Sequence, residues 1–131
     1  MLNNPIAAEI LNLNQKLLDS ITAGDWQTYE SLCCPDLTCF EPETRGHLVE
    51  GMAFHRFYFD LGPSAGARNV TMATPHVRLV GDDVAIVAYT RLVQRLDANG
   101  SPVTVRVEET RVWQCVDRSW MLVHIHRSDP T

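Results

Sequence analysis

Charged side chains of one parity stand on three consecutive predicted strands: Arg91, Glu109, Arg111 and Arg127. Residues of equal parity share one face of a strand, so these four are expected on the same face. The turn after the first of these strands predicts Arg91 opposite Glu109. The same register sets Tyr89 opposite Arg111, and the next turn sets Glu109 opposite Arg127. This face would therefore carry three guanidinium groups and one carboxylate.

Two interpretations of this charged face are open. On the outside of the protein it would be a solvated row of salt bridges that adds little stability. On the inside, its excess positive charge would require an anion, because a buried unpaired charge is costly. Guanidinium groups bind carboxylates in a bidentate geometry, so a small organic acid would suit such a site. The residues alone favour the solvated row.

The histidines and cysteines give weaker signals. His55 falls in an apolar helical stretch, where a hydrogen-bonded histidine in a semi-buried helix is the simplest interpretation. His124 and His126 share a strand face, but no third ligand accompanies them, so we expect no metal. The sequence has no Gly-x-Ser-x-Gly motif, phosphate-binding loop or dinucleotide fingerprint. We therefore expect neither a cofactor nor covalent catalysis.

Composition limits the class of protein. The 131 residues and 14.8 kDa predict one domain spanning residues 1–131. Hydrophobic residues make up 45%, which excludes intrinsic disorder, and the net charge of -5 argues against nucleic acid binding. Apolar runs stay well below the ~20 residues of a membrane span. The N-terminus lacks the features of a signal peptide, so we expect a cytoplasmic protein with reduced cysteines.

Helical patterns fill the first half of the sequence and strand patterns the second, which predicts an α+β fold. Asn4 and Gly24 are suited to begin and end a first helix, and Asp25 to cap a short second one that Pro35 stops. A short strand over 37–41 follows. A third helix, over 48–61, is apolar nearly all round and is expected to be largely enclosed.

Four long strands are predicted over 70–80, 84–96, 103–116 and 120–127. Turn residues separate them, so they form an antiparallel meander that curves around a helix and makes a cone with an internal pocket. Residues 84–89 are apolar on both faces. One face can pack on the helices, and we predict that a second copy of the chain covers the other. The alternative is an ordinary central strand with a modestly apolar outer face.

This order of elements resembles the nuclear transport factor 2-like cone. Within that superfamily, several motifs are similar to the association, or hub, domain of calcium/calmodulin-dependent protein kinase II. The similarity covers residues 10–128 and rests on the motifs at 40–43, 46–52, 54–59, 75–77, 79–83, 108–113 and 124–128. The resemblance implies a module that associates with itself as a homodimer or a higher ring.

The resemblance also implies a deep arginine-lined pocket, which in the animal hub accepts small carboxylates such as γ-hydroxybutyrate. It reverses the preference for a solvated row, because the matching positions line that pocket. The residues expected to bind ligand are His55, Tyr89, Arg91, Glu109, Arg111 and Arg127. The kinase domain and the calmodulin-binding segment have no counterpart here. We therefore expect a stand-alone hub with no kinase activity and no calmodulin binding.

Two other functions stay open. SnoaL-like relatives of the cone include isomerases and dehydratases, so a small enzyme could act on an acidic metabolite by proton transfer, with His55, Glu109 and Tyr89 as acid and base. Against this, arginines would flank Glu109 and keep it ionised. The chain could also be a scaffold that organises another protein. The sequence leaves the ligand, the partner and the ring size open.

Overall fold

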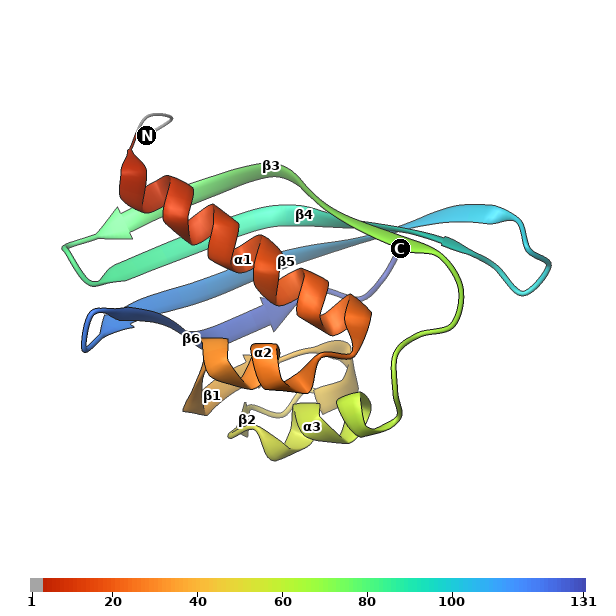
Figure 1. Cartoon of the computed structure of the whole chain (residues 1–131), viewed down its shortest axis with the longest axis horizontal. Helices are drawn as coiled ribbons and strands as arrows, with labels where there is room; N and C mark the ends of the chain where they lie inside the picture. Colours follow the sequence, from red (N-terminus) through yellow and green to blue (C-terminus); the bar gives the residue numbers. More distant parts are fainter. Residues whose placement is uncertain (1–3) are drawn as a thin grey trace.

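A computed structural model describes residues 4–131. Its helices are α1 (Pro5–Ala23), α2 (Trp26–Leu32), the 3-10 turn η1 (Pro42–Thr44) and α3 (Ala53–Asp60). Its strands are β1 (Cys33–Phe40), β2 (Val49–Glu50), β3 (Arg68–Val80), β4 (Val84–Leu96), β5 (Pro102–Val116) and β6 (Ser119–Arg127). Helices come first and a curved sheet follows, which confirms the α+β class (Figure 1). Within residues 4–131, no helix is both long and apolar enough to span a membrane.

Both predicted ends of α1 and the predicted start of α2 are confirmed. The Asn4 side chain accepts hydrogen bonds from the amides of Ile6 and Ala7, and Pro5 takes the first helical position. Gly24 ends α1 in the left-handed conformation, with φ 68°, which glycine adopts at little cost. Asp25 then caps α2 by accepting from the amide of Thr28. Local chemistry thus accounts for both ends of α1 and for the start of α2.

The region around Pro35 differs from the prediction. Pro35 was expected to stop α2, but the helix ends earlier and β1 already begins at Cys33. The pairing of β1 with β6 shifts register between Cys33 and Thr38. Proline cannot donate a ladder hydrogen bond, so it fits an irregular stretch of strand of this kind. Pro35 therefore marks a bulge in β1.

The predicted third helix is also too long at its start. Val49 and Glu50 form β2, which pairs with Cys39 and Thr38 of β1, and α3 begins only at Ala53. The expectation that α3 would be enclosed is wrong for the single chain. Its one buried residue is His55, while Phe57 is 61% exposed. Within the chain, α3 is covered where His55 and Phe59 contact Tyr29 of α2 and where His55 meets Glu41.

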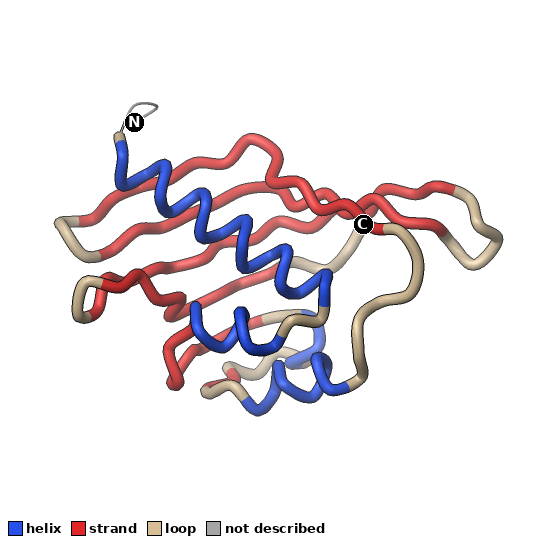
Figure 2. The backbone as a smooth tube through the Cα atoms, viewed as in Figure 1, coloured by secondary structure: helices blue, strands red, loops and turns tan. Residues whose placement is uncertain are grey.

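The sheet has the order β2-β1-β6-β5-β4-β3. Strands β3 to β6 form the predicted antiparallel meander, whereas β1 runs parallel to β6. Figure 2 shows the strands side by side as one curved sheet with the helices packed on one face. Register shifts in β3–β4, between Ala73 and His76, and in β5–β6, between Val112 and Trp113, are bulges of the kind that bend a sheet. Helix α1 lies across the face of β3, β4 and β5, while α2 turns back beside the C-terminal half of α1 and α3 lies on the far side of α2 (Figure 1).

One predicted strand register is wrong by two residues. Tyr89 pairs with Glu109 and Arg91 with Val107, so Arg91 does not lie directly opposite Glu109. The loop between β4 and β5 is five residues long, because the Asp97 side chain accepts hydrogen bonds from the amides of Asn99 and Ser101. An even shift keeps every side chain on its predicted face. The predicted pairing of Glu109 with Arg127 is confirmed.

The core lies between the helices and the concave face of the sheet. Fully buried apolar residues include Ile10, Leu17, Leu18, Leu37, Val87, Trp113, Leu122 and Ile125. Asn14 of α1 is also buried and accepts a hydrogen bond from the indole nitrogen of Trp113 at 3.1 Å. This contact fixes the helix to β5 near the C-terminal end of that strand. From Trp113 back towards Glu109, where β6 ends, the concave face becomes polar.

Candidate functional site: an arginine-lined cavity

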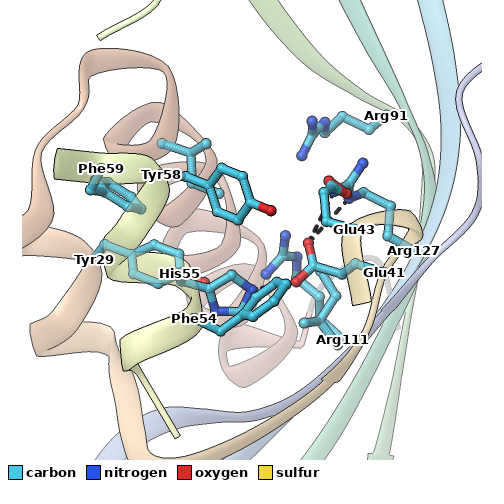
Figure 3. A pocket seen from close by; sticks show the side chains of 12 residues that line it. Tyr29, Glu41, Glu43, Phe54, His55, Tyr58, Phe59, Arg91, Arg111 and Arg127 are labelled. Atoms are coloured by element: carbon cyan, nitrogen blue, oxygen red, sulfur yellow. Dashed lines mark hydrogen bonds and ion pairs between the residues drawn. The ribbon is translucent and has the colours of Figure 1, made fainter. Parts of the chain in front are cut away.

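A cavity of about 190 Å³ lies between the concave face of the sheet and helices α1, α2 and α3 (Figure 3). Its apolar wall is formed by Ile21, Phe54, Phe59 and Ile125, and its polar lining by Tyr29, Glu41, Glu43, His55, Tyr58, Arg91, Arg111 and Arg127. Pockets for drug-sized ligands usually measure roughly 300–1,000 Å³, so this cavity suits a small molecule.

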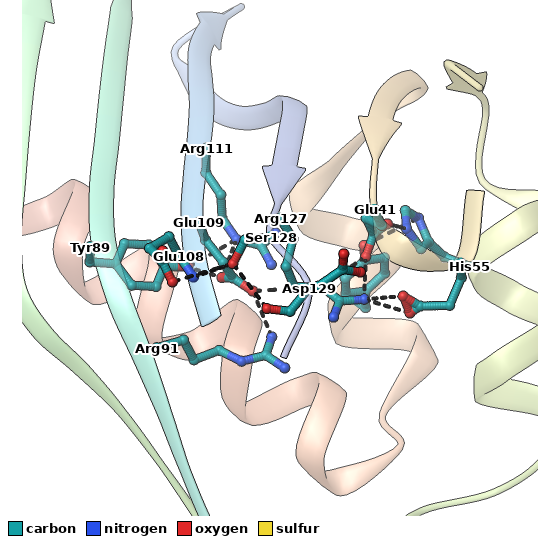
Figure 4. Close-up of polar contacts among 12 residues, drawn as sticks. Glu41, His55, Tyr89, Arg91, Glu108, Glu109, Arg111, Arg127, Ser128 and Asp129 are labelled. Carbon is teal, nitrogen blue, oxygen red and sulfur yellow. Dashed lines mark hydrogen bonds and ion pairs between the residues drawn. The ribbon is translucent and has the colours of Figure 1, made fainter. Parts of the chain in front are cut away.

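Glu109 of β5 holds two of the arginines (Figure 4). Arg91 Nη1 donates to Glu109 Oε2 at 2.8 Å, and Arg111 Nε donates to Glu109 Oε1 at 3.3 Å. The Tyr89 hydroxyl also donates to Glu109 Oε1. Arg91 reaches Glu109 diagonally, which long side chains can do across one pair of strands. The two-residue error in register therefore does not prevent the predicted contact.

The environment of Glu109 keeps this carboxyl group ionised. Burial alone would raise its pKa, but Arg111, Arg91 and the Tyr89 hydroxyl together more than offset burial, so the pKa lies below its usual value. Burial, opposed by the charge of Arg111 and reinforced by that of Glu109, raises the pKa of Tyr89 to about 12. Glu109 is thus a fixed anion that orients arginines, as its flanking residues predicted.

A second carboxylate, Glu41, bridges α3 and β6. Its Oε1 pairs with Nε2 of His55, and its Oε2 accepts from Arg127 Nη2 at 3.1 Å. The other ring nitrogen of His55 lies 3.4 Å from the Tyr29 hydroxyl. Both nitrogens of His55 are therefore engaged by protein groups. This matches the hydrogen-bonded, semi-buried histidine that the sequence suggested.

Glu41 is held in the ionised form. Burial would raise its pKa, but the hydrogen bond and charge of His55 and the charge of Arg127 lower the pKa to about 2. Its side chain is 11% exposed. A carboxylate of this kind is a structural anion, because its charge is compensated only in the folded protein.

Glu43 is the third carboxylate at the cavity. It belongs to η1, and both of its carboxylate oxygens accept hydrogen bonds from Arg127 Nη2, at 2.5 and 2.6 Å. With Glu41 and Glu109, it balances the charges of the three arginines. The excess positive charge expected on this face is therefore not present within the site, because the sequence prediction counted one carboxylate where the fold brings together three.

Not every hydrogen-bond donor of the arginines is satisfied. Arg111 is 2% exposed, and its Nη1 is buried with no hydrogen-bond partner among residues 4–131. The same holds for Nε of Arg91. Buried donors without a partner are rare and costly, and each calls for an explanation. The charges of the site are thus balanced while its hydrogen bonds are incomplete.

The predicted site residues fall into two layers. His55, Arg91, Arg111 and Arg127 line the cavity, whereas Tyr89 and Glu109 lie behind the arginines and act on them. Glu41, Glu43 and Tyr29 were missed as site residues. Glu41 and Glu43 belong to the Phe40–Glu43 motif, but their contact with Arg127 spans more than 80 residues and depends on the parallel pairing of β1 with β6.

One group of potential metal ligands occurs beside the cavity. Ligand atoms of Cys39, Glu41 and His55 lie within 4.8 Å of one another. Burial and the charge of Glu41 raise the pKa of the Cys39 thiol to about 12, so it stays protonated and a poor ligand. The Oε2 atom of Glu41 already accepts a hydrogen bond from Arg127. A protonated Cys39 thiol and a Glu41 carboxylate that is already paired with Arg127 both disfavour metal binding. The expectation of no bound metal stays a prediction.

Comparisons with known proteins agree with this arrangement. A family model described as the calcium/calmodulin dependent protein kinase II association domain matches residues 6–131. The delta subunit of calcium/calmodulin-dependent protein kinase type II from Oryctolagus cuniculus is 48% identical over 122 residues, which are 92% of this chain and 23% of the rabbit protein. This chain therefore spans less than a quarter of that kinase's length.

Solved structures give the same result. The calcium/calmodulin-dependent protein kinase II hub homology domain from Chlamydamonas reinhardtii is 51% identical with a TM-score of 0.88, and the match covers 95% of this chain and 98% of that one. The association domain of the C. elegans kinase is 46% identical with a TM-score of 0.89, covering 94% of this chain and 95% of that one.

A more distant structure identifies the fold alone. A nuclear transport factor 2-like superfamily protein from Salmonella enterica is 22% identical, with a TM-score of 0.73 over 95% of this chain and 90% of that one. The predicted nuclear transport factor 2-like fold is thus confirmed. Because a family model covers residues 6–131 and relatives share about half of the residues, the chain belongs to the calcium/calmodulin-dependent protein kinase II association domain family.

Proposed function

We propose that this chain is a self-associating hub-like domain whose arginine-lined cavity binds a small carboxylate without transforming it. The self-association rests on membership of an association-domain family. The carboxylate rests on one observation, the unpartnered buried Nη1 of Arg111 at a cavity that two further arginines line. The two parts of the function use different faces of the sheet.

The outer face of β4 supports association. Ala85, Val87 and Tyr89 point into the core and are buried, while the alternate residues Val84, Ile86 and Ala88 remain half-buried or exposed in the single chain. Apolar side chains on an outer face gain free energy when a second surface removes them from water, at roughly 25 cal/mol per Å². A second copy of the chain is the partner that an association domain supplies.

The cavity suits a carboxylate with a short carbon chain. Its guanidinium groups come from β4, β5 and β6, and its apolar wall includes Ile125 together with Phe54 and Phe59. Figure 3 shows the two phenylalanines on the side of the cavity opposite the arginines. A carboxylate oxygen can accept from a guanidinium nitrogen that has no partner, and such charge-assisted hydrogen bonds strengthen in a partly desolvated site. The cavity volume limits the ligand to a small organic acid.

Proton-transfer catalysis has less support than binding. A general base needs a carboxylate that readily takes up a proton, yet the partners of Glu41 and Glu109 hold the pKa of each carboxyl group below its usual value, and Glu43 is paired with Arg127. Both ring nitrogens of His55 contact Glu41 or Tyr29. We therefore expect binding without turnover. Consumption of an acid over time would favour the isomerase-like or dehydratase-like alternative.

Association is tested by the mass of the purified protein. Light scattering coupled to size exclusion at micromolar concentration is expected to give at least twice 14.8 kDa, because the outer face of β4 needs a cover. A homodimer is the minimum unit, and a higher ring is an accepted outcome. A monomer at all concentrations up to about 100 μM, well above the Kd range of stable dimers, would contradict the association.

Carboxylate binding is tested with Arg111→Ala. The variant is expected to weaken the binding of a short carboxylic acid by about 1.5–3 kcal/mol, the range for hydrogen bonds to charged groups. Calorimetry against a panel of two- to five-carbon acids measures the effect. Arg111→Lys retains the charge without the planar fork and should recover only part of the affinity.

The matched control is Arg118→Ala, because Arg118 is an exposed arginine in the turn between β5 and β6, outside the cavity and away from the outer face of β4. It should bind acids as the wild type does, and all three variants should keep the assembly state of the wild type. If no acid binds the wild type, or if Arg111→Ala binds equally well, the cavity is not a carboxylate site.

A further inference from the structure

We infer that Glu43 is a built-in competitor that occupies the guanidinium of Arg127, and that an external carboxylate binds by taking its place. This inference rests on the proposed carboxylate binding and adds how the site selects and admits its ligand. Glu43 lies at the cavity beside Arg127, and the two side chains are paired in the structure (Figure 3).

The three carboxylates of the site differ in how firmly they are held. Glu109 is fully buried and contacts Tyr89, Arg91 and Arg111. Glu41 is 11% exposed and is held by His55 as well as by Arg127. Removing either from its partners would leave buried charges uncompensated, which is costly. Neither of these two carboxylates can be exchanged for a ligand.

Glu43 has neither constraint. Its side chain is 34% exposed, and Arg127 is the one partner recorded for it among residues 4–131. It sits on the three-residue turn η1, so its carboxylate can rotate into solvent without disturbing a strand. Separating this pair costs less than separating the buried ones, because water can solvate the partly exposed Glu43 carboxylate and Glu41 continues to compensate Arg127. Glu43 is therefore the replaceable anion of the site.

Exchange of one carboxylate for another keeps the charge of the site constant. Arg91, Arg111 and Arg127 balance Glu41, Glu43 and Glu109, so a monocarboxylate that displaces Glu43 restores the same balance. A neutral molecule of the same shape would leave Arg127 with Glu41 alone. Because a ligand must replace the Glu43 carboxylate, the site selects anions over neutral molecules. The binding free energy of a monocarboxylate is then the difference between its contact with Arg127 and the contact of Glu43 with Arg127.

The test uses butyrate as the probe and calorimetry on the purified full chain. Glu43→Gln and Glu43→Ala are expected to bind butyrate about threefold to tenfold more tightly than the wild type, since the internal competitor is gone. Glu50→Gln is the matched control, because it removes one exposed glutamate from the neighbouring strand β2. It should leave the affinity unchanged. Butyramide should bind none of these proteins.

A double-mutant cycle assigns the effect to Arg127. In an Arg127→Ala background, Glu43→Gln should no longer tighten butyrate binding, because the two residues act through one contact. Tighter binding by the Glu43 variants that depends on Arg127 supports the inference, including the case in which the wild type binds too weakly to detect.

Three outcomes overturn the inference. If the wild type binds butyrate and the Glu43 variants bind it equally or less tightly, Glu43 is not a competitor, while the proposed carboxylate binding stands. If Glu50→Gln tightens binding as much, the effect is general electrostatics. If neither the wild type nor any variant binds butyrate or the other short acids, the proposed binding function fails as well.

Discussion

Glu109→Gln is expected to lower the free energy of unfolding by about 3–5 kcal/mol, the cost of removing one partner from a buried ion pair. The amide keeps the size of the side chain but removes the charge that compensates Arg91 and Arg111. Arg111 cannot escape to solvent, since it is 2% exposed and belongs to the middle of the sheet. The substitution would therefore destabilise the folded state.

Urea unfolding, followed by fluorescence, measures this loss at one fixed protomer concentration, because association contributes to apparent stability. The neighbouring Glu108→Gln serves as the control. Glu108 is exposed on the other face of β5, where its carboxylate accepts from Ser128 at 3.3 Å. The control should change the free energy of unfolding by less than about 0.5 kcal/mol. Equal effects of the two substitutions would mean that the arginine cluster does not depend on Glu109.

Acid is expected to destabilise the folded protein through Glu41. Its pKa is about 2 in the folded state against a reference value of 4.5, so the ionised form stabilises the fold. This contribution is fully present above about pH 4.5 and is lost as the pH falls towards 2. A difference of this size corresponds to about 3 kcal/mol. The pKa of Glu109 is also lowered in the folded state, so protonation of Glu109 adds to the acid sensitivity.

The effect expected of Glu41 is a difference in the free energy of unfolding between wild type and variant that disappears as the pH is lowered. The free energy of unfolding of Glu41→Gln should lie below that of the wild type at pH 7, and the two values should converge by about pH 2. Glu50→Gln controls for the loss of one negative charge and should run parallel to the wild type. A gap between wild type and Glu41→Gln that stays constant from pH 7 to pH 2 would mean that the charge of Glu41 does not stabilise the fold.

Much of the fold could be predicted from local chemistry. The caps at Asn4, Gly24 and Asp25 and the limits of β4 follow from side chains within a few residues of each boundary. The parts that were missed depend on distant partners. Val49 and Glu50 form a strand only because β1 lies beside them, and Pro35 is tolerated in β1 because the ladder with β6 is already irregular there.

The residues of the site also divide into those that local patterns predict and those that depend on distant partners. The parity of Arg91, Glu109, Arg111 and Arg127 was enough to bring them to one face, even though the register was wrong by two residues. Glu41 and Glu43 could not be assigned in this way. Their role depends on a parallel pairing of the first and last strands, which has no turn signal in the sequence. A count of charges from the meander alone therefore overestimated the positive charge of the cavity.

The parallel pairing of β1 with β6 also has a consequence for how the chain folds. Hairpins of the meander close over short loops, whereas β1 and β6 join residues about 85 positions apart, such as Thr38 and His124. Closing a longer loop costs more chain entropy, so contacts between distant segments tend to form late. Arg91, Arg111 and Glu109 can meet as soon as the meander exists. Arg127 reaches Glu41 only after β1 and β6 have come together, so we expect the completed cavity to be among the last features of the native state to appear.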